Sequence, residues 1–212
     1  MRLVRNLLAL IGLLTLVALG AAILAFEPYV NKARSLDDSA LGVYAGVART
    51  ILTTGDAMQA LVYQRRVAPG RGVGDVERTL EEVAAELGLQ SLGTLAVQRE
   101  IQQRTGKVFP LLQVYLFCDP DLASDLIRHN PGMAAYLPCR VTLYEDARGG
   151  LWLMTPNLDL LLHGSRPLPI SLQERAAGLQ AKLREMVDRA AGADDPQAAE
   201  ARNEQTVVGF TS

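Results

Sequence analysis

Two cysteines are the residues of this 212-residue sequence best suited to chemistry. Cys118 ends a run rich in β-branched and aromatic residues, and Cys139 directly precedes a second β-like run, so both are expected at strand ends. Antiparallel pairing of these strands would bring the two Cα atoms to the ~5.5 Å separation that a disulfide requires. The sequence therefore predicts a structural disulfide. Inert buried thiols, or thiols that bind metal or haem, are the alternatives, and the spacing excludes a Cys-x-x-Cys redox motif.

A soft ligand set for copper or haem needs further side chains near the cysteines, and His129 and Met133 are the candidates. His129, however, directly precedes Asn-Pro-Gly, where a histidine commonly interacts with the free carbonyls at a helix C-terminus. We therefore predict no cofactor and no firm metal ligand. His163 has the same setting before a glycine, and neither histidine belongs to a recognised triad, so we assign no catalytic residue.

Four large side chains are candidates for a ligand surface: Tyr136, Tyr144, Trp152 and Met154. Residues of like parity share one face of a strand, so Trp152 and Met154 are expected on the face opposite to their odd-numbered neighbours. One face then packs on helices, and the other lines an open, concave sheet surface. Such a surface suits an apolar ligand, a partner protein or a second copy of the chain, unless helices or a dimer partner cover both faces.

The elements that must position these residues follow from periodicity and turn chemistry. Helices are predicted at residues 39–53, 76–87, 92–104 and 121–129, and a longer helix opens with the capping-box sequence Ser-Leu-Gln-Glu at 171–174. Strands are predicted at 60–67, 111–118, 140–145 and 151–155, and the last two form a hairpin. This mixture of elements predicts an α+β domain.

Residues 7–26 carry no charge, and as a helix they would span ~30 Å at ~1.5 Å per residue, the thickness of the hydrocarbon core of a bilayer. A cleaved signal peptide is the alternative, but its apolar region is usually shorter, roughly 7 to 15 residues. We therefore expect a single-pass transmembrane anchor. Arg2 and Arg5 precede the apolar run, so the positive-inside rule places residues 1–6 in the cytoplasm.

That orientation places the rest of the chain in the periplasm or outside the cell, beyond a bacterial inner membrane. The opposite orientation is the alternative, because Lys32 and Arg34 follow the apolar run and make the charge difference small. We expect a linker helix at 27–55, a globular domain at 56–192 and a disordered tail at 193–212. The formal charge of −2, from 21 basic and 23 acidic residues, offers no basic surface for nucleic acid. The expected partners are the membrane itself, a membrane or periplasmic protein, and a second copy of the chain.

Several short motifs carry a family resemblance. They are Phe-Cys-Asp-Pro at 117–120, Tyr-Leu-Pro-Cys-Arg at 136–140, Tyr-Glu-Asp at 144–146, Leu-Trp-Leu at 151–153 and Asn-Leu-Asp at 157–159. Over residues 56–192 the chain resembles the uncharacterised bacterial family called domain of unknown function 302. The resemblance implies a fold similar to that of the TATA-box-binding protein, a curved antiparallel sheet with helices on one face. It implies no established activity. Members with both cysteines look like membrane-associated proteins, some with sulfur or respiratory metabolism.

The sequence thus predicts a membrane-anchored, periplasm-facing binding module that is not an enzyme. The first alternative is a thiol, copper or haem accessory protein for respiratory or sulfur metabolism that uses Cys118 and Cys139. The second is a structural subunit of a membrane complex.

Overall fold

The computed structural model describes residues 2–34, 36–164 and 167–192. The helices are α1 (Arg2–Arg34), α2 (Ala40–Thr54), α3 (Met58–Leu61), α4 (Val73–Glu86), α5 (Val97–Thr105), α6 (Pro120–His129), α7 (Asp159–His163) and α8 (Ile170–Ala191), with a 3-10 turn η1 (Pro131–Ala135). The strands are β1 (Val62–Arg66), β2 (Gln90–Ala96), β3 (Leu112–Cys118), β4 (Cys139–Glu145) and β5 (Leu151–Pro156). The predicted disordered tail at 193–212 lies outside the described residues.

The five strands form one sheet in the order β1-β5-β4-β3-β2, and every neighbouring pair is antiparallel. The predicted hairpin is β4–β5. Its turn is closed by Asp146, whose Oδ1 accepts hydrogen bonds of 2.8 Å from the backbone N–H groups of Arg148 and Gly150. The α+β class is confirmed, and the likeness to the TATA-box-binding protein stays a prediction.

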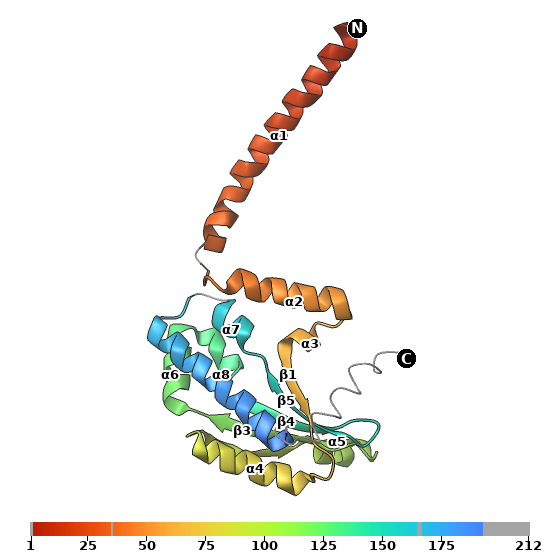
Figure 1. The fold of residues 1–212 in the computed structure, drawn as a ribbon, viewed down its shortest axis with the longest axis vertical. Helices are drawn as coiled ribbons and strands as arrows, with labels where there is room; N and C mark the ends of the chain where they lie inside the picture. The colour runs from red at the N-terminus through yellow and green to blue at the C-terminus, as the bar shows by residue number, and fades with distance from the viewer. Residues whose placement is uncertain (1, 35, 165–166, 193–212) are drawn as a thin grey trace.

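The core lies between one face of this sheet and the helices α4 and α8 (Figure 1). Burial alternates along the strands: in β4 and β5, Val141, Leu143 and Leu153 have no solvent exposure. The two helices contribute buried apolar side chains at helical spacing to this core. They are Val76, Leu80 and Val83 from α4 and Leu183, Met186 and Val187 from α8. The even-numbered positions of β3, β4 and β5 point to the opposite face.

The predicted helix at 92–104 is wrong in its first half. Residues Gln90–Ala96 form β2, an edge strand paired with β3, and the helix α5 begins only at Val97. β2 lies at the edge of the sheet, and six of its seven residues are exposed, so no alternation of buried and exposed side chains marks it in the sequence. A bulge between Ser91 and Gly93 further disturbs its period.

The capping box predicted for the long helix is not formed either. α8 begins at Ile170, one residue earlier than expected, and its first turn uses the Pro169 carbonyl, which accepts 2.9 Å hydrogen bonds from the N–H groups of Leu172 and Gln173. Ser171 therefore lies inside the helix, and its side chain is not needed as a cap.

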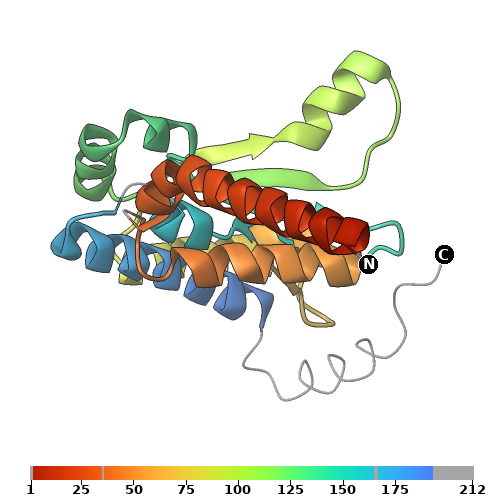
Figure 2. The same cartoon turned by 90° about the horizontal axis from the view of Figure 1, so that it is seen from above.

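α1 projects away from the domain (Figure 1), and its segment Ala9–Glu27 is long and apolar enough to cross a membrane. Length and composition alone do not separate an anchor from a signal sequence. α2 follows and lies on the domain (Figure 2). Its Tyr44 hydroxyl donates a 2.6 Å hydrogen bond to the Gly164 carbonyl after α7, so this part of the predicted linker is packed against the domain.

Candidate functional site

A cleft of about 840 Å³ lies at the edge of the sheet, between α8, the edge strand β1 and α7. Its volume is within the ~300–1,000 Å³ range of small-molecule sites. The lining is mainly polar and charged. It includes Tyr63, Arg65, Asp159, His163, Gln180, Arg184, Glu185, Asp188 and Arg189.

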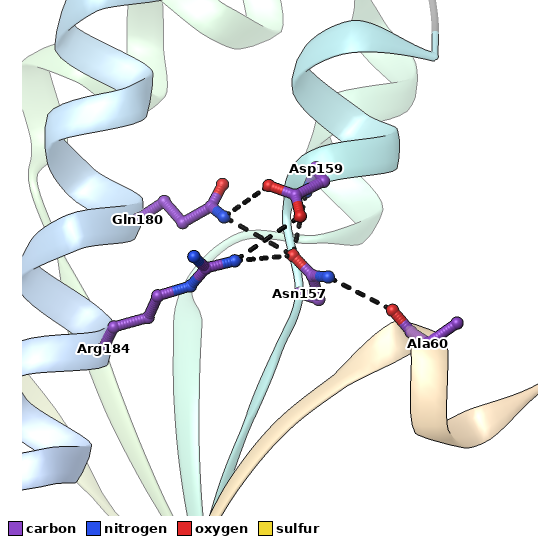
Figure 3. Close-up of polar contacts among 5 residues, drawn as sticks. All are labelled: Ala60, Asn157, Asp159, Gln180 and Arg184. Atoms are coloured by element: carbon purple, nitrogen blue, oxygen red, sulfur yellow. Dashed lines mark hydrogen bonds and ion pairs between the residues drawn. The ribbon is translucent and has the colours of Figure 1, made fainter. Parts of the chain in front are cut away.

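At the α7 end, side chains of α8 hold the junction between β5 and α7 (Figure 3). Gln180 Nε2 donates a 2.6 Å hydrogen bond to Asp159 Oδ1. An Arg184 terminal nitrogen donates to Asn157 Oδ1 at 3.1 Å, and Asn157 Nδ2 in turn donates to the Ala60 carbonyl at 3.1 Å. This network fixes the position of Asp159 relative to α8 and to the segment that leads into β1.

At the other end, Tyr63 and Arg65 of β1 meet Asp188 of α8. The Tyr63 hydroxyl donates to the carboxylate at 2.8 Å, and Arg65 Nε lies 2.7 Å from Asp188 Oδ1. Burial, with the hydrogen bond to Asp188, raises the pKa of the Tyr63 phenol above its ordinary value. The guanidinium carbons of Arg65 and Arg184 lie 4.3 Å and 5.2 Å from the centre of the Tyr63 ring, a cation–π arrangement that holds both cations in place.

Two polar atoms of the α8 residues are buried without a protein partner, Gln180 Oε1 and Arg184 Nε. Gln180 is only 8% exposed, so solvent does not replace the missing bond. One atom is an acceptor and the other a donor. Three arginines and three carboxylates line the cleft, so its formal charge is balanced. The arrangement suits a small neutral or zwitterionic molecule that carries both an N–H donor and an oxygen acceptor.

The sequence analysis missed this cleft. Gln180 and Arg184 lie four residues apart along the inner side of α8, and a polar pair at that spacing beside an apolar stripe was the available signal. Asn157 and Asp159 belong to a motif that was used only for the resemblance. Nothing in the sequence around Tyr63 marks it as a lining residue.

The two cysteines do not form the predicted disulfide: both are free. Their strands do pair, but the register sets Cys139 opposite Phe117. Since side chains alternate along a strand, Cys118 points to the other face of the sheet. A register offset of one residue therefore separates the two thiols, and it could not be read from the sequence.

Both thiols are weak nucleophiles in this setting, because the reactive form of a cysteine is the thiolate. Burial, with a smaller effect of the Cys118 thiol, raises the pKa of Cys139 to about 11. Burial and the Asp119 carboxylate raise the pKa of Cys118. Met133 is buried in the core, and His129 ends α6 with its Nε2 buried and unpaired. Across the part of the chain that the structure describes, no group of three or more His, Cys, Asp or Glu side chains could hold a metal ion.

Three of the four predicted ligand-surface residues lie together. Tyr144 and Trp152 are directly opposite in the β4–β5 ladder, and Met154 pairs with Thr142 on the same face. We call this the open face; its apolar side chains are Leu112, Val114, Leu116, Tyr144, Trp152 and Met154, all partly exposed. Trp152 is fixed by a 2.8 Å hydrogen bond from Nε1 to Asp146 Oδ2.

Tyr136 lies elsewhere. It follows η1 and lines a small apolar pocket on the helical side with Leu126, Met133 and Cys139. It therefore does not contribute to the open face.

Comparison with known proteins gives a family and a fold. The family model described as "Domain of unknown function DUF302" matches residues 64–190. The crystal structure of an uncharacterized conserved DUF302 protein from Bacillus stearothermophilus is similar, with 22% identity, a TM-score of 0.53, and coverage of 61% of this chain and 98% of that one. No match is found among curated proteins.

Proposed function

Since this chain belongs to the DUF302 family, whose description names no activity, we propose a function from its own geometry: a membrane-anchored binding module that holds a small polar molecule in the cleft between α8 and β1. The ligand is zwitterionic or amide-bearing, of the class of free amino acids and short peptides. The observation that carries the proposal is a pair of buried polar atoms without a protein partner, the acceptor Gln180 Oε1 and the donor Arg184 Nε, on residues one turn apart in α8. Buried polar atoms are normally paired, and a ligand carrying both groups would pair these two.

Binding rather than turnover is proposed because the ionised groups of the cleft already hold one another. Asp159 accepts from Gln180, Asp188 accepts from Tyr63 and Glu185 accepts from Arg189, so all three carboxylates of the cleft are engaged. A general base needs a carboxylate or imidazole free to take a proton from the substrate.

The anchor and its orientation are part of the proposal. The apolar segment Ala9–Glu27 supports a membrane span, and Arg2 and Arg5 ahead of it support a cytoplasmic N-terminus. The cleft would then face the periplasm and sample small molecules there.

The test is ligand-dependent thermal unfolding of the full chain in detergent micelles, with a panel of L-amino acids and dipeptides at millimolar concentration. A ligand present at ~100 times its Kd stabilises the folded state by ~2.7 kcal/mol, a measurable rise in Tm. We expect members of the panel to raise Tm in the wild type and not in Gln180→Met, which keeps the side-chain size and removes both the unpaired acceptor and the donor to Asp159. Gln103→Met, at an exposed position of α5, is the matched control and should respond like the wild type. A panel without effect, or a shift retained in Gln180→Met, contradicts the proposal.

The open face supports a second candidate function, association with a second copy of the chain. Its observation is the row of partly exposed apolar side chains on β3, β4 and β5, a surface that monomeric proteins rarely leave uncovered. Light scattering of the solubilised chain should give a dimer that Met154→Glu dissociates. A monomer at all concentrations would rule this function out.

A further inference from the structure

We propose that α2 lies in the surface of the same membrane that α1 spans, with its outward apolar stripe among the lipids. The stripe consists of Leu41, Ala45, Ala48 and Leu52. The inference rests on the proposed membrane span of α1 and goes beyond it, because it assigns a second membrane-contacting element.

α2 has two apolar sides. On the inner side Ala40 is 1% exposed, and Tyr44 is hydrogen-bonded to the carbonyl of Gly164. On the outer side Leu41 is 74% and Leu52 is 85% exposed, with Ala45 and Ala48 exposed between them. The spacings of four, three and four residues align these side chains along one stripe. A helix packed on a protein in water normally carries polar side chains there.

The polar groups of α2 need little water. Arg49 is the only charged residue between Ala40 and Thr54, and its long side chain can reach the phosphate level while its stem stays among apolar groups. Thr50, Thr53 and Thr54 donate their hydroxyls to carbonyls of their own helix, at 3.1, 2.9 and 2.7 Å. These hydroxyls are therefore satisfied at a depth where water is scarce.

The chain path keeps α2 near the bilayer. The apolar segment of α1 ends at Glu27 and the helix continues to Arg34, which adds ~10 Å at ~1.5 Å per residue. The headgroup region adds ~5–8 Å on each side of the hydrocarbon core, so α1 ends near the outer edge of this region. Five residues separate Arg34 from Ala40 and can span up to ~20 Å, which is enough for the chain to return α2 to the boundary between headgroups and acyl chains.

The orientation of α2 also fits a position at the membrane surface. α2 begins near the end of α1 and runs at an angle to it, at the end of the domain nearest to α1 (Figure 1), and from above α2 lies on top of the domain (Figure 2). Phe26 and Tyr29, whose ring centres are 6.2 Å apart, sit at the end of the apolar segment, where aromatic side chains mark the membrane interface. A helix lying flat there meets the boundary between headgroups and acyl chains.

A membrane-bound α2 would also fix the orientation of the cleft. Asp37, just before α2, lies 3.0 Å from Nδ1 of His163, a lining residue of the cleft, and accepts a 2.9 Å hydrogen bond from Gln173 of α8. The domain would then be held by two elements, α1 and α2, with no free rotation about α1.

The experiment uses the full chain in nanodiscs made with phospholipid brominated in the acyl chains, a short-range quencher of tryptophan. The only tryptophan is removed by Trp152→Phe, and single tryptophans are introduced by Leu52→Trp or Leu41→Trp. The control is Val108→Trp, at a position 94% exposed in the segment after α5, at the far end of the domain from α1 (Figure 1). All three substitutions replace exposed side chains, so folding should be retained.

We expect at least twofold quenching at positions 52 and 41 relative to non-brominated discs, and none at position 108. If the chain enters the discs but a tryptophan at position 52 is quenched no more than one at position 108, the inference about α2 is overturned and the α1 anchor is unaffected. A chain that fails to enter the discs overturns both.

Discussion

The two faces of the sheet are built from alternate residues of the same strands, yet they have different roles. Leu143 and Leu153 point to the covered face and have no solvent exposure, whereas their neighbours Tyr144 and Trp152 point to the open face and remain partly exposed. The covered face gains the free energy of burial against α4 and α8. The open face gains little, so its large apolar side chains are available for contacts with another molecule.

The largest expected difference between the faces is in stability. Leu153→Ala should cost ~2–5 kcal/mol, because it leaves a cavity in the core. Met154→Ala, one residue further along β5, should cost ~1 kcal/mol or less. Denaturant unfolding of the solubilised chain, followed by the emission of Trp152, measures both. Equal losses for the two variants would show that the open face is covered.

The second-largest expected difference between the two faces is in the reactivity of their thiols. Cys118 is partly exposed, whereas Cys139 is buried with its pKa raised to about 11, so roughly one Cys139 thiol in a thousand is ionised at pH 8. A maleimide should therefore label Cys118 at least tenfold faster, with Cys118→Ser and Cys139→Ser identifying each site. If the cysteines of intact cells are labelled only after reduction, they form a disulfide in the cell. That result would contradict the pairing of Cys139 with Phe117, which sets the two thiols on opposite faces.

A smaller effect is expected at the edge of the sheet, in the cleft. Asp159→Asn keeps the shape of the side chain but weakens its bonds with Gln180 and Arg184. We expect a loss of ~1 kcal/mol, since charged hydrogen bonds at a half-exposed site contribute modestly. Glu82→Gln, at an exposed position of α4, is the control and should change nothing. Equal thermal stability of both variants would show that the network does not hold the cleft.

The smallest expected effect depends on pH. Hydrogen bonds from the Ser39 N–H and from His163 hold the pKa of Asp37 below its usual value. A carboxyl with a lowered folded-state pKa adds stability above its unfolded pKa of ~3.9, and this contribution is lost as the pH falls through the folded value. Asp37→Asn should therefore reduce Tm at pH 6 and flatten its fall between pH 5 and pH 3. A variant with the wild-type slope would contradict this role.

How far the sequence predicts this molecule depends on how local each signal is. The β4–β5 hairpin was predicted within one residue, since the Asp-Ala-Arg-Gly-Gly turn and the alternation in both strands are local. β2 was missed because an exposed edge strand has no alternation to read. The face of Trp152 and Met154 followed from parity, but the register of Cys139 against Phe117 is a long-range property.

The cleft was the least predictable feature for the same reason. Tyr63 and Asp188 are 125 positions apart, and Asn157 and Arg184 are 27 apart. Only the packing of α8 across β1 and β5 brings these side chains together. The local sequence feature that indicates such a contact is a polar pair beside an apolar stripe on a helix, as Gln180 and Arg184 are on α8.

The most direct test of the central proposal is native mass spectrometry of the full chain, released from detergent after brief incubation with the amino-acid and dipeptide panel. We predict one bound small molecule per chain for the wild type and for Gln103→Met, and none for Gln180→Met. Spectra that show only the unliganded mass for all three proteins, or the same adduct on Gln180→Met, would contradict the assignment of the cleft as a binding site.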